Sequence, residues 1–274
     1  MKPAKFDYVQ PRDVADAVKL LSSHQNAKIL AGGQSLGPML NLRLVRVDLL
    51  VDISRLEELR AVEEKSEFWR IGAAVTHATL EDDGARLNGI EALGAIARGI
   101  AYRAIRNRGT IGGSLVHADP AADWPLALAT LGASVLVKDT AVKAVKVVDL
   151  IKGTFLSDIG PDQIVIAIDI PKYSASSRFG YYKFCRKVGE FAEASAACLF
   201  DPELKIARVF AGALGGPARL LPQLSMEVAR KGIAGLTTAA MLGDLKQVLL
   251  NATDAEFSMH LAAVGRAIRK AFAA

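Results

Sequence analysis

Apolar positions recur along this chain with helical and strand periods in alternation. The first helical stripe lies between residues 12 and 23 and consists of Val14, Ala17, Val18 and Leu21. Short apolar runs bounded by polar or glycine residues predict strands at 28–30, 49–53 and 69–75. The pattern therefore predicts a small α/β unit that ends near residue 57, with a further strand just beyond it.

A larger α/β unit is predicted between residues 58 and 175. Helical sequence extends from 90 to 106, and another helix is predicted from 121 to 131. Strands are predicted at 134–138, 142–148 and 163–170. The small and polar residues from 171 to 177 read as a linker to whatever follows.

The last hundred residues predict a separate C-terminal domain, residues 176–274. An antiparallel meander of three strands is expected at 180–186, 194–200 and 205–213. Three helices follow at about 223–231, 237–249 and 255–272. The last helix carries a stripe that favours a core face over a partner groove: Phe257, Leu261, Val264 and Ile268. The whole chain is expected to be α+β.

Composition indicates a soluble globular protein, with 51% apolar and 23% charged residues among 274. The longest nearly apolar stretch, 124–137, ends at Lys138 and is shorter than a bilayer span. The N-terminus has no hydrophobic signal region. We therefore expect a cytoplasmic protein with no membrane span.

The net charge of +5 is spread along the chain, and its densest basic segment is Arg98 to Arg108. No aromatic residues interleave with basic clusters, so a cofactor phosphate or an acidic partner protein explains this segment as well as nucleic acid does. We expect no nucleic-acid partner.

Cysteine and histidine are too few and too scattered to hold a metal centre. Only Cys185 and Cys198 are present, whereas an ordinary iron–sulfur cluster needs four thiolates. The four histidines lack the spacing of a zinc site. We expect no metal on this chain and no catalytic acid–base set.

Two diglycine segments, Gly32-Gly33 and Gly112-Gly113, are candidate ligand-binding segments. Paired glycines allow positive φ and expose successive N–H groups, which can hold an anion beside a helix N-terminus. Two such segments together suggest a diphosphate bound from both sides. The dinucleotide fingerprint Gly-x-Gly-x-x-Gly is absent, so the phosphates must be held in another way.

The residues around these glycines, 31–36, 106–114 and 119–123, resemble the flavin-binding medium subunit of molybdenum hydroxylases. That family includes aerobic carbon monoxide dehydrogenase and the flavin domain of xanthine dehydrogenase. The resemblance extends from 6–8 through 186–191 to the helical C-terminus. It implies a two-subdomain FAD-binding unit of the vanillyl-alcohol-oxidase/PCMH type, with subdomains 1–57 and 58–175, followed by the C-terminal flavoprotein domain.

The resemblance implies non-covalent FAD, since no attachment histidine is evident. One wall of the diphosphate site would consist of Ala31, Gly32, Gly33, Gln34, Ser35 and Leu36. The other wall would consist of Thr110, Ile111, Gly112, Gly113 and Ser114. Ordinary loop packing remains an alternative reading for Gln34 and Leu36.

Four more positions match family contacts to the cofactor. Asp123 would meet a sugar-chain hydroxyl, although an acid at a helix N-terminus is also favoured by the macrodipole. Lys183 would place a cation near the flavin, where its alternative is a solvent-facing strand lysine. Val165 would supply a backbone contact, and Phe191 would cover the ring where relatives carry a tyrosine or aliphatic group.

As a family member, the chain would be the flavoprotein subunit of an oxidoreductase. A molybdopterin-binding large subunit and a [2Fe–2S] small subunit would complete a dimer of heterotrimers. Electrons would pass from the clusters through FAD to an external acceptor. Two alternatives remain: a free-standing FAD-dependent oxidase or reductase of related fold, and a non-catalytic interaction protein whose diglycines are turns.

Overall fold

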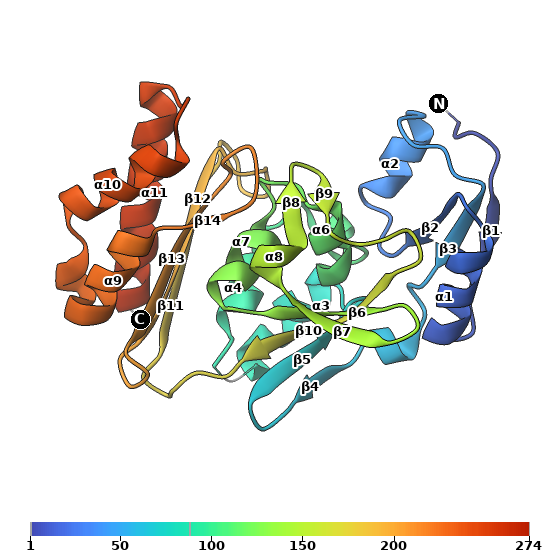
Figure 1. The fold of residues 1–274 in the computed structure, drawn as a ribbon, viewed down its shortest axis with the longest axis horizontal. Coiled ribbons are helices and arrows are strands. Elements are labelled where there is room, and N and C mark those ends of the chain that lie inside the picture. The colour runs from blue at the N-terminus through green and yellow to red at the C-terminus, as the bar shows by residue number, and fades with distance from the viewer. Residues whose placement is uncertain (1, 88, 274) are drawn as a thin grey trace.

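Three main β-sheets, each with helices beside it, follow one another along the longest axis of the molecule in the computed structural model (Figure 1). The structure describes residues 2–87 and 89–273. It has a mixed α/β fold, and the N-terminal sheet and the C-terminal helices lie at opposite ends.

The N-terminal sheet is parallel, with strand order β1-β3-β2. Its strands are β1 (Asp7–Val9), β2 (Ala27–Leu30) and β3 (Leu49–Asp52), and its helices are α1 (Val14–Ser23) and α2 (Leu36–Asn41). Asp13 caps α1 by accepting a hydrogen bond from the Asp16 amide at 2.7 Å. The first diglycine segment directly follows the carboxyl end of β2. It therefore lies at the edge of the sheet where the parallel strands end.

The central sheet is antiparallel, with strand order β4-β5-β10-β6-β7. Its strands are β4 (Val62–Glu64), β5 (Phe68–Gly72), β6 (Ser134–Lys138), β7 (Val142–Lys146) and β10 (Ile164–Pro171), preceded by the 3₁₀ helix η1 (Glu57–Leu59). The register of β10 on β6 shifts between Val165 and Ala167. This bulge frees the Ile166 carbonyl to accept the Ala73 amide at 3.0 Å.

The segments between the central strands fold as short helices and one hairpin. They are α3 (His77–Asp83), η2 (Gly84–Arg86), α4 (Ala92–Arg98), α5 (Arg103–Arg106), α6 (Ile111–His117), α7 (Asp123–Thr130), α8 (Val147–Leu150), β8 (Ile151–Gly153) and β9 (Leu156–Ser157). The helical sequence predicted from 90 to 106 is interrupted at 99–102. Ala101 has φ 44° there and its amide donates to the Gly189 carbonyl at 3.0 Å, so a tertiary contact breaks the helix.

The C-terminal sheet has four strands, β11-β12-β13-β14, which corrects the three expected from sequence. Their bounds are β11 (Arg178–Phe184), β12 (Ala194–Asp201), β13 (Ile206–Gly212) and β14 (Arg219–Leu220). The last strand has only two residues, too few to show a period of two. It is followed by α9 (Pro222–Lys231), η3 (Gly232–Gly235), α10 (Thr238–Val248) and α11 (Asp254–Ala273).

This sheet lies between the central part and the C-terminal helices, and both of its faces are buried (Figure 1). Ala197, Leu199 and Phe210 belong to the central core, whereas Ala196 and Cys198 belong to the core beneath α11. Burial raises the pKa of the Cys198 thiol to about 12, so it is an unreactive core residue.

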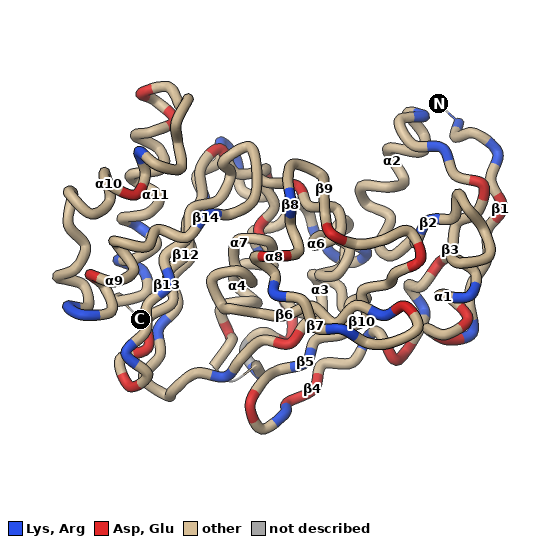
Figure 2. Tube along the Cα trace, viewed as in Figure 1, with Lys and Arg blue, Asp and Glu red and all other residues tan. Residues whose placement is uncertain are grey.

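Charges of both signs are interspersed over all three parts of the molecule (Figure 2). Within the described residues, no helix combines the length and the apolar character needed to cross a membrane. Nor do the described residues bring together three or more metal-ligating side chains of His, Cys, Asp or Glu.

Candidate cofactor site

The first diglycine segment forms an open turn between β2 and α2. Gly33 has φ 71°, a conformation that glycine adopts without strain. Its carbonyl accepts the Gly37 amide at 2.9 Å, so the turn at 34–35 leads directly into α2. No acceptor within the described residues takes the amides of residues 33–36. These amides are the unpaired donors of a helix start, and they can bind an anion.

The second diglycine segment is built differently from the expectation of exposed amides. Thr110 caps α6, and its hydroxyl accepts the Gly113 amide at 3.1 Å. The Ile111 and Gly112 amides donate to the carbonyls of Val75 and Ala73. Since Ser114 also donates its amide within the helix, this wall offers hydroxyl groups rather than a nest of free amides.

The two segments lie directly against one another. A Cβ at Gly32 would stand 2.1 Å from the Arg108 carbonyl oxygen, and a Cβ at Gly113 would stand 3.8 Å from the Cβ of Ala31. A Cβ at Gly112 would stand 2.6 Å from the Cβ of Ala73 and 2.7 Å from its carbonyl oxygen. The first glycine of each pair therefore permits close packing between distant segments, and the contact of Gly32 with Arg108 joins the N-terminal and central parts at the candidate site.

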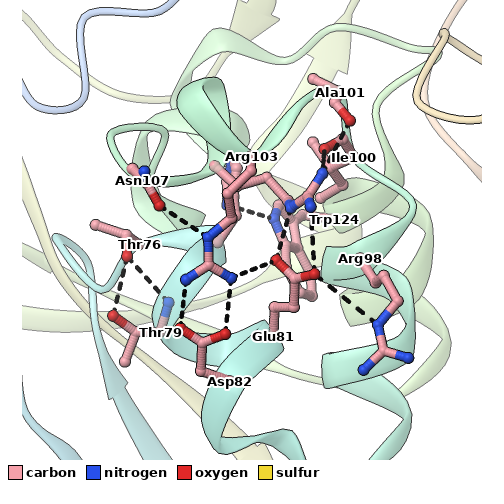
Figure 3. A network of polar contacts seen from close by, with 12 residues as sticks. Thr76, Thr79, Glu81, Asp82, Arg98, Ile100, Ala101, Arg103, Asn107 and Trp124 are labelled. Atoms are coloured by element: carbon pink, nitrogen blue, oxygen red, sulfur yellow. Dashed lines mark hydrogen bonds and ion pairs between the residues drawn. The ribbon is translucent and has the colours of Figure 1, made fainter.

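An ion-pair network holds the segment that leads to the second diglycine (Figure 3). Glu81 of α3 receives two bonds from the Arg106 guanidinium, at 2.7 and 3.2 Å, and both side chains are 11% exposed. Arg106 also donates to the carbonyls of Ile100 and Ala101. Arg103 bridges Glu81 and Asp82, so these arginines of the basic segment act as internal braces.

A buried histidine lies beneath this network. The Trp124 indole donates to Nδ1 of His77 at 3.1 Å, and the His77 amide donates to the Gly109 carbonyl. Burial, aided by the nearby Arg106 charge, lowers the pKa of His77 to about 4. His77 is therefore a neutral acceptor that fixes Trp124 and the approach to Thr110.

Asp123 and Lys183 form a buried ion pair between α7 and β11. The Lys183 ammonium lies 3.0 Å from Asp123 Oδ1 and donates to the Gly99 carbonyl at 2.9 Å. The Tyr181 hydroxyl donates to the same Asp123 oxygen at 2.7 Å. Burial raises the pKa of Asp123, while Lys183 and Tyr181 oppose that shift. Lys183 is thus not a solvent-facing strand residue, because its side chain is 9% exposed.

The remaining expected residues divide between buried and exposed positions. Val165 is buried at the bulge of β10. Phe191 is 65% exposed in the loop between β11 and β12, although Gly189 of that loop pairs with Ile100. Gln34 bonds the Gly32 carbonyl through its side chain at 3.0 Å. The structure therefore brings the two diglycine segments together and brings Asp123 and Lys183 together, and it leaves Phe191 at the surface.

The donor set fits FAD. Open amides at 33–36, the hydroxyl groups of Ser35 and Ser114, and the Asp123–Lys183 pair supply donors, acceptors and a cation of the kinds that a flavin nucleotide requires. Sequence reasoning missed Tyr181 and Glu81. Tyr181 is two residues before Lys183 and shares its strand face, a periodicity that was available in the sequence; Glu81 required the fold.

Comparison with known proteins defines the class. Residues 4–173 match the family model described as "FAD binding domain in molybdopterin dehydrogenase". The chain therefore belongs to the family of FAD-binding medium subunits of molybdenum hydroxylases, whose members are subunits of oxidoreductases.

Particular relatives agree with this assignment. The nicotine 6-hydroxylase medium subunit of Paenarthrobacter nicotinovorans is 34% identical over 226 residues, which cover 81% of this chain and 79% of the relative. The carbon monoxide dehydrogenase medium chain of Hydrogenophaga pseudoflava is 34% identical over 72% of this chain and 69% of its own length. A solved structure of carbon monoxide dehydrogenase from that organism superposes with TM-score 0.90 at 27% identity, covering 100% of this chain and 99% of that one.

Proposed function

We propose that this chain binds FAD non-covalently and transfers electrons within a multisubunit molybdenum hydroxylase, from [2Fe–2S] clusters of a partner subunit to an external acceptor. The observation that carries the proposal is the packing of the two glycine segments against each other beside the open amides of residues 33–36. Bound FAD supplies redox chemistry that no side chain of this protein provides.

In this proposal, each wall of the site has a distinct role. The amides of Gly33, Gln34, Ser35 and Leu36 donate to the diphosphate, and Ala31 and Gly32 keep that turn against the second wall. The second wall, Thr110 to Ser114, contributes hydroxyl groups and a rigid helix start. Asp123 accepts from a sugar-chain hydroxyl, and the Lys183 cation stabilises negative charge on the flavin. Val165 supplies a backbone contact near the flavin, and Phe191 covers the ring.

The proposed assembly is a dimer of heterotrimers in the cytoplasm, with a molybdopterin-binding large subunit and a [2Fe–2S] small subunit. Residues 1–57 and 58–175 would form the two FAD-binding subdomains, and residues 176–274 the C-terminal domain. Relatives named as subunits for oxidising nicotine, caffeine and carbon monoxide support this division of labour. One flavin-binding chain type serving such different substrates is expected when the substrate site lies on another subunit.

The cofactor part of the proposal is tested by releasing the flavin. Acid precipitation of the purified chain should leave all FAD in the supernatant, at about one FAD per chain, because non-covalent binding ends when the fold is lost. Yellow protein in the pellet would contradict non-covalent binding. A colourless chain that does not bind added FAD would contradict the cofactor assignment itself.

The subunit part is tested by turnover and by metal analysis. The isolated chain, loaded with FAD, should oxidise no carbon monoxide, purine or aldehyde with an artificial acceptor. Copurified partner chains should bring molybdenum and iron and restore substrate oxidation. Substrate-dependent turnover by the isolated chain would instead support a free-standing flavin oxidase.

A further inference from the structure

We infer that Tyr181 is a positioning residue of the FAD site, whose hydroxyl holds the Asp123 carboxylate in an orientation directed at a sugar-chain hydroxyl of the cofactor. This inference rests on the proposed function, in which Asp123 meets the cofactor. It adds a second residue of β11 to the site, beside Lys183.

Geometry places the Tyr181 hydroxyl on one oxygen of the carboxylate. The hydroxyl donates to Asp123 Oδ1 at 2.7 Å. Lys183 contacts both oxygens, Oδ1 at 3.0 Å and Oδ2 at 3.2 Å. Among the described side chains, Oδ2 is therefore contacted by Lys183 alone, and a carboxylate oxygen with one donor retains acceptor capacity for a ligand hydroxyl. Tyr181 thus fixes the rotation of the carboxylate, so that Oδ2 keeps its orientation toward the ligand hydroxyl.

Electrostatics give the tyrosine a second effect. Asp123 is only 5% exposed, and burial alone favours its neutral form. The groups that face it are Lys183 and Tyr181 of β11, and Cys185, which follows the end of β11, acts in turn on Tyr181. The pKa of Tyr181 is raised well above 10, so the phenol remains a donor at every working pH. Its removal would shift Asp123 toward protonation, and a neutral carboxyl group is a weaker acceptor for the cofactor hydroxyl than a carboxylate.

The next residue on the strand supplies a matched control. Tyr182 faces the opposite side of β11, where its hydroxyl accepts from Arg266 of α11. Replacing either tyrosine by phenylalanine removes one oxygen from the same strand. Only Tyr181→Phe changes the surroundings of Asp123.

The experiment titrates FAD into the full-length apoprotein at pH 6 and pH 8.5 and follows quenching of flavin fluorescence. Tyr181→Phe should raise the FAD Kd about tenfold at pH 6, because loss of the hydrogen bond leaves more of Asp123 protonated at that pH. The increase in Kd should be smaller at pH 8.5, where Asp123 is more fully ionised in the variant as well. Wild type and Tyr182→Phe should show little difference between the two pH values. In an Asp123→Asn background, Tyr181→Phe should add no pH dependence.

Two results would overturn the inference alone. One is a Tyr181→Phe affinity that matches Tyr182→Phe at both pH values while wild type binds FAD tightly. The other is an equal loss at both pH values that persists in the Asp123→Asn background, which indicates a packing defect. Wild-type protein that fails to bind FAD would overturn the proposed function, and the inference with it.

Discussion

At the candidate site, the surroundings of each residue determine its role. Gly32 and Gly33 are adjacent, yet one is required by a neighbouring backbone and the other by a positive φ. His77 is a titratable side chain, yet its burial makes it a neutral hydrogen-bond acceptor. Residue type alone would not separate these roles, because each depends on what packs against the residue.

Gly32→Ala should separate the two walls of the site. The added Cβ would lie 2.1 Å from the Arg108 carbonyl oxygen, so one backbone segment must move. We expect FAD affinity to fall at least tenfold, corresponding to about 1.4 kcal/mol or more. Gly37→Ala is the control, because nothing lies within 4 Å of its Cβ position. Equal FAD affinity of the two variants in a fluorescence titration would contradict the role of the contact.

His77 should make the free energy of unfolding depend on pH. Its native pKa of about 4 lies below the ordinary value of 6.5, so the unfolded chain binds the proton more readily. Stability should therefore be fully present above pH 6.5 and fall as the pH approaches 4, by about 3 kcal/mol in the limit. His77→Asn keeps an acceptor near the Nδ1 position without titrating there. Urea denaturation from pH 4 to pH 7 should show a shallower pH dependence for this variant, and an unchanged dependence would exclude His77 as its source.

At the scale of elements, local patterns predicted most long helices and strands because their apolar stripes face a core. The strand at 134–138 and the last helix have close to the predicted bounds. The sequence did not reveal the break at Ala101, the bulge at Val165 or the strand β14. The break and the bulge depend on contacts with segments far away in the chain, such as Ala101 with Gly189, whereas β14 is too short to show a pattern.

At the candidate site, too, some features could be predicted from the sequence and others depend on the fold. The two diglycine segments were recognisable from their sequence, and Asp123 and Lys183 from family resemblance. The use of the Ile111 and Gly112 amides by Val75 and Ala73 was not recognisable, because the acceptors belong to a turn after another strand. Side-chain type identified the participants, and only the fold decided which donors remain open.

The α3–α5 network should determine how firmly the second wall is held. Glu81→Gln removes the charge that faces Arg106, both being 11% exposed, and should lower the free energy of unfolding by about 2 kcal/mol. FAD affinity should fall as well, since the segment after Arg106 carries Arg108 and Thr110. Asp82→Asn, at a 56% exposed side chain, is the matched control and should cost less. Thermal melts with and without FAD would measure both effects, and equal losses would contradict the bracing role.

On the scale of the whole molecule, β11 connects two cores. Tyr181 belongs with the central core, and Tyr182 with the core beneath α11. Gly180 brings the strand so close to α11 that a Cβ there would lie 2.0 Å from the Ala267 carbonyl oxygen. The strand that positions Asp123 is therefore also the strand on which the last helix rests.

Because β11 is shared between the two cores, FAD binding and the local unfolding of the C-terminal part should influence one another. If FAD binds only when β11 is folded, local opening of β11 weakens FAD binding by a certain free energy. Bound FAD must then make the local opening of β11 less favourable by that same free energy. Amide hydrogen exchange along Arg178–Phe184 should therefore slow when FAD is added. Exchange in α10, which is not part of β11, should change little. Slowing confined to residues 31–36 would show that the C-terminal part is thermodynamically independent. If β11 does slow, its exchange rate and the FAD dissociation constant report one free energy by two methods.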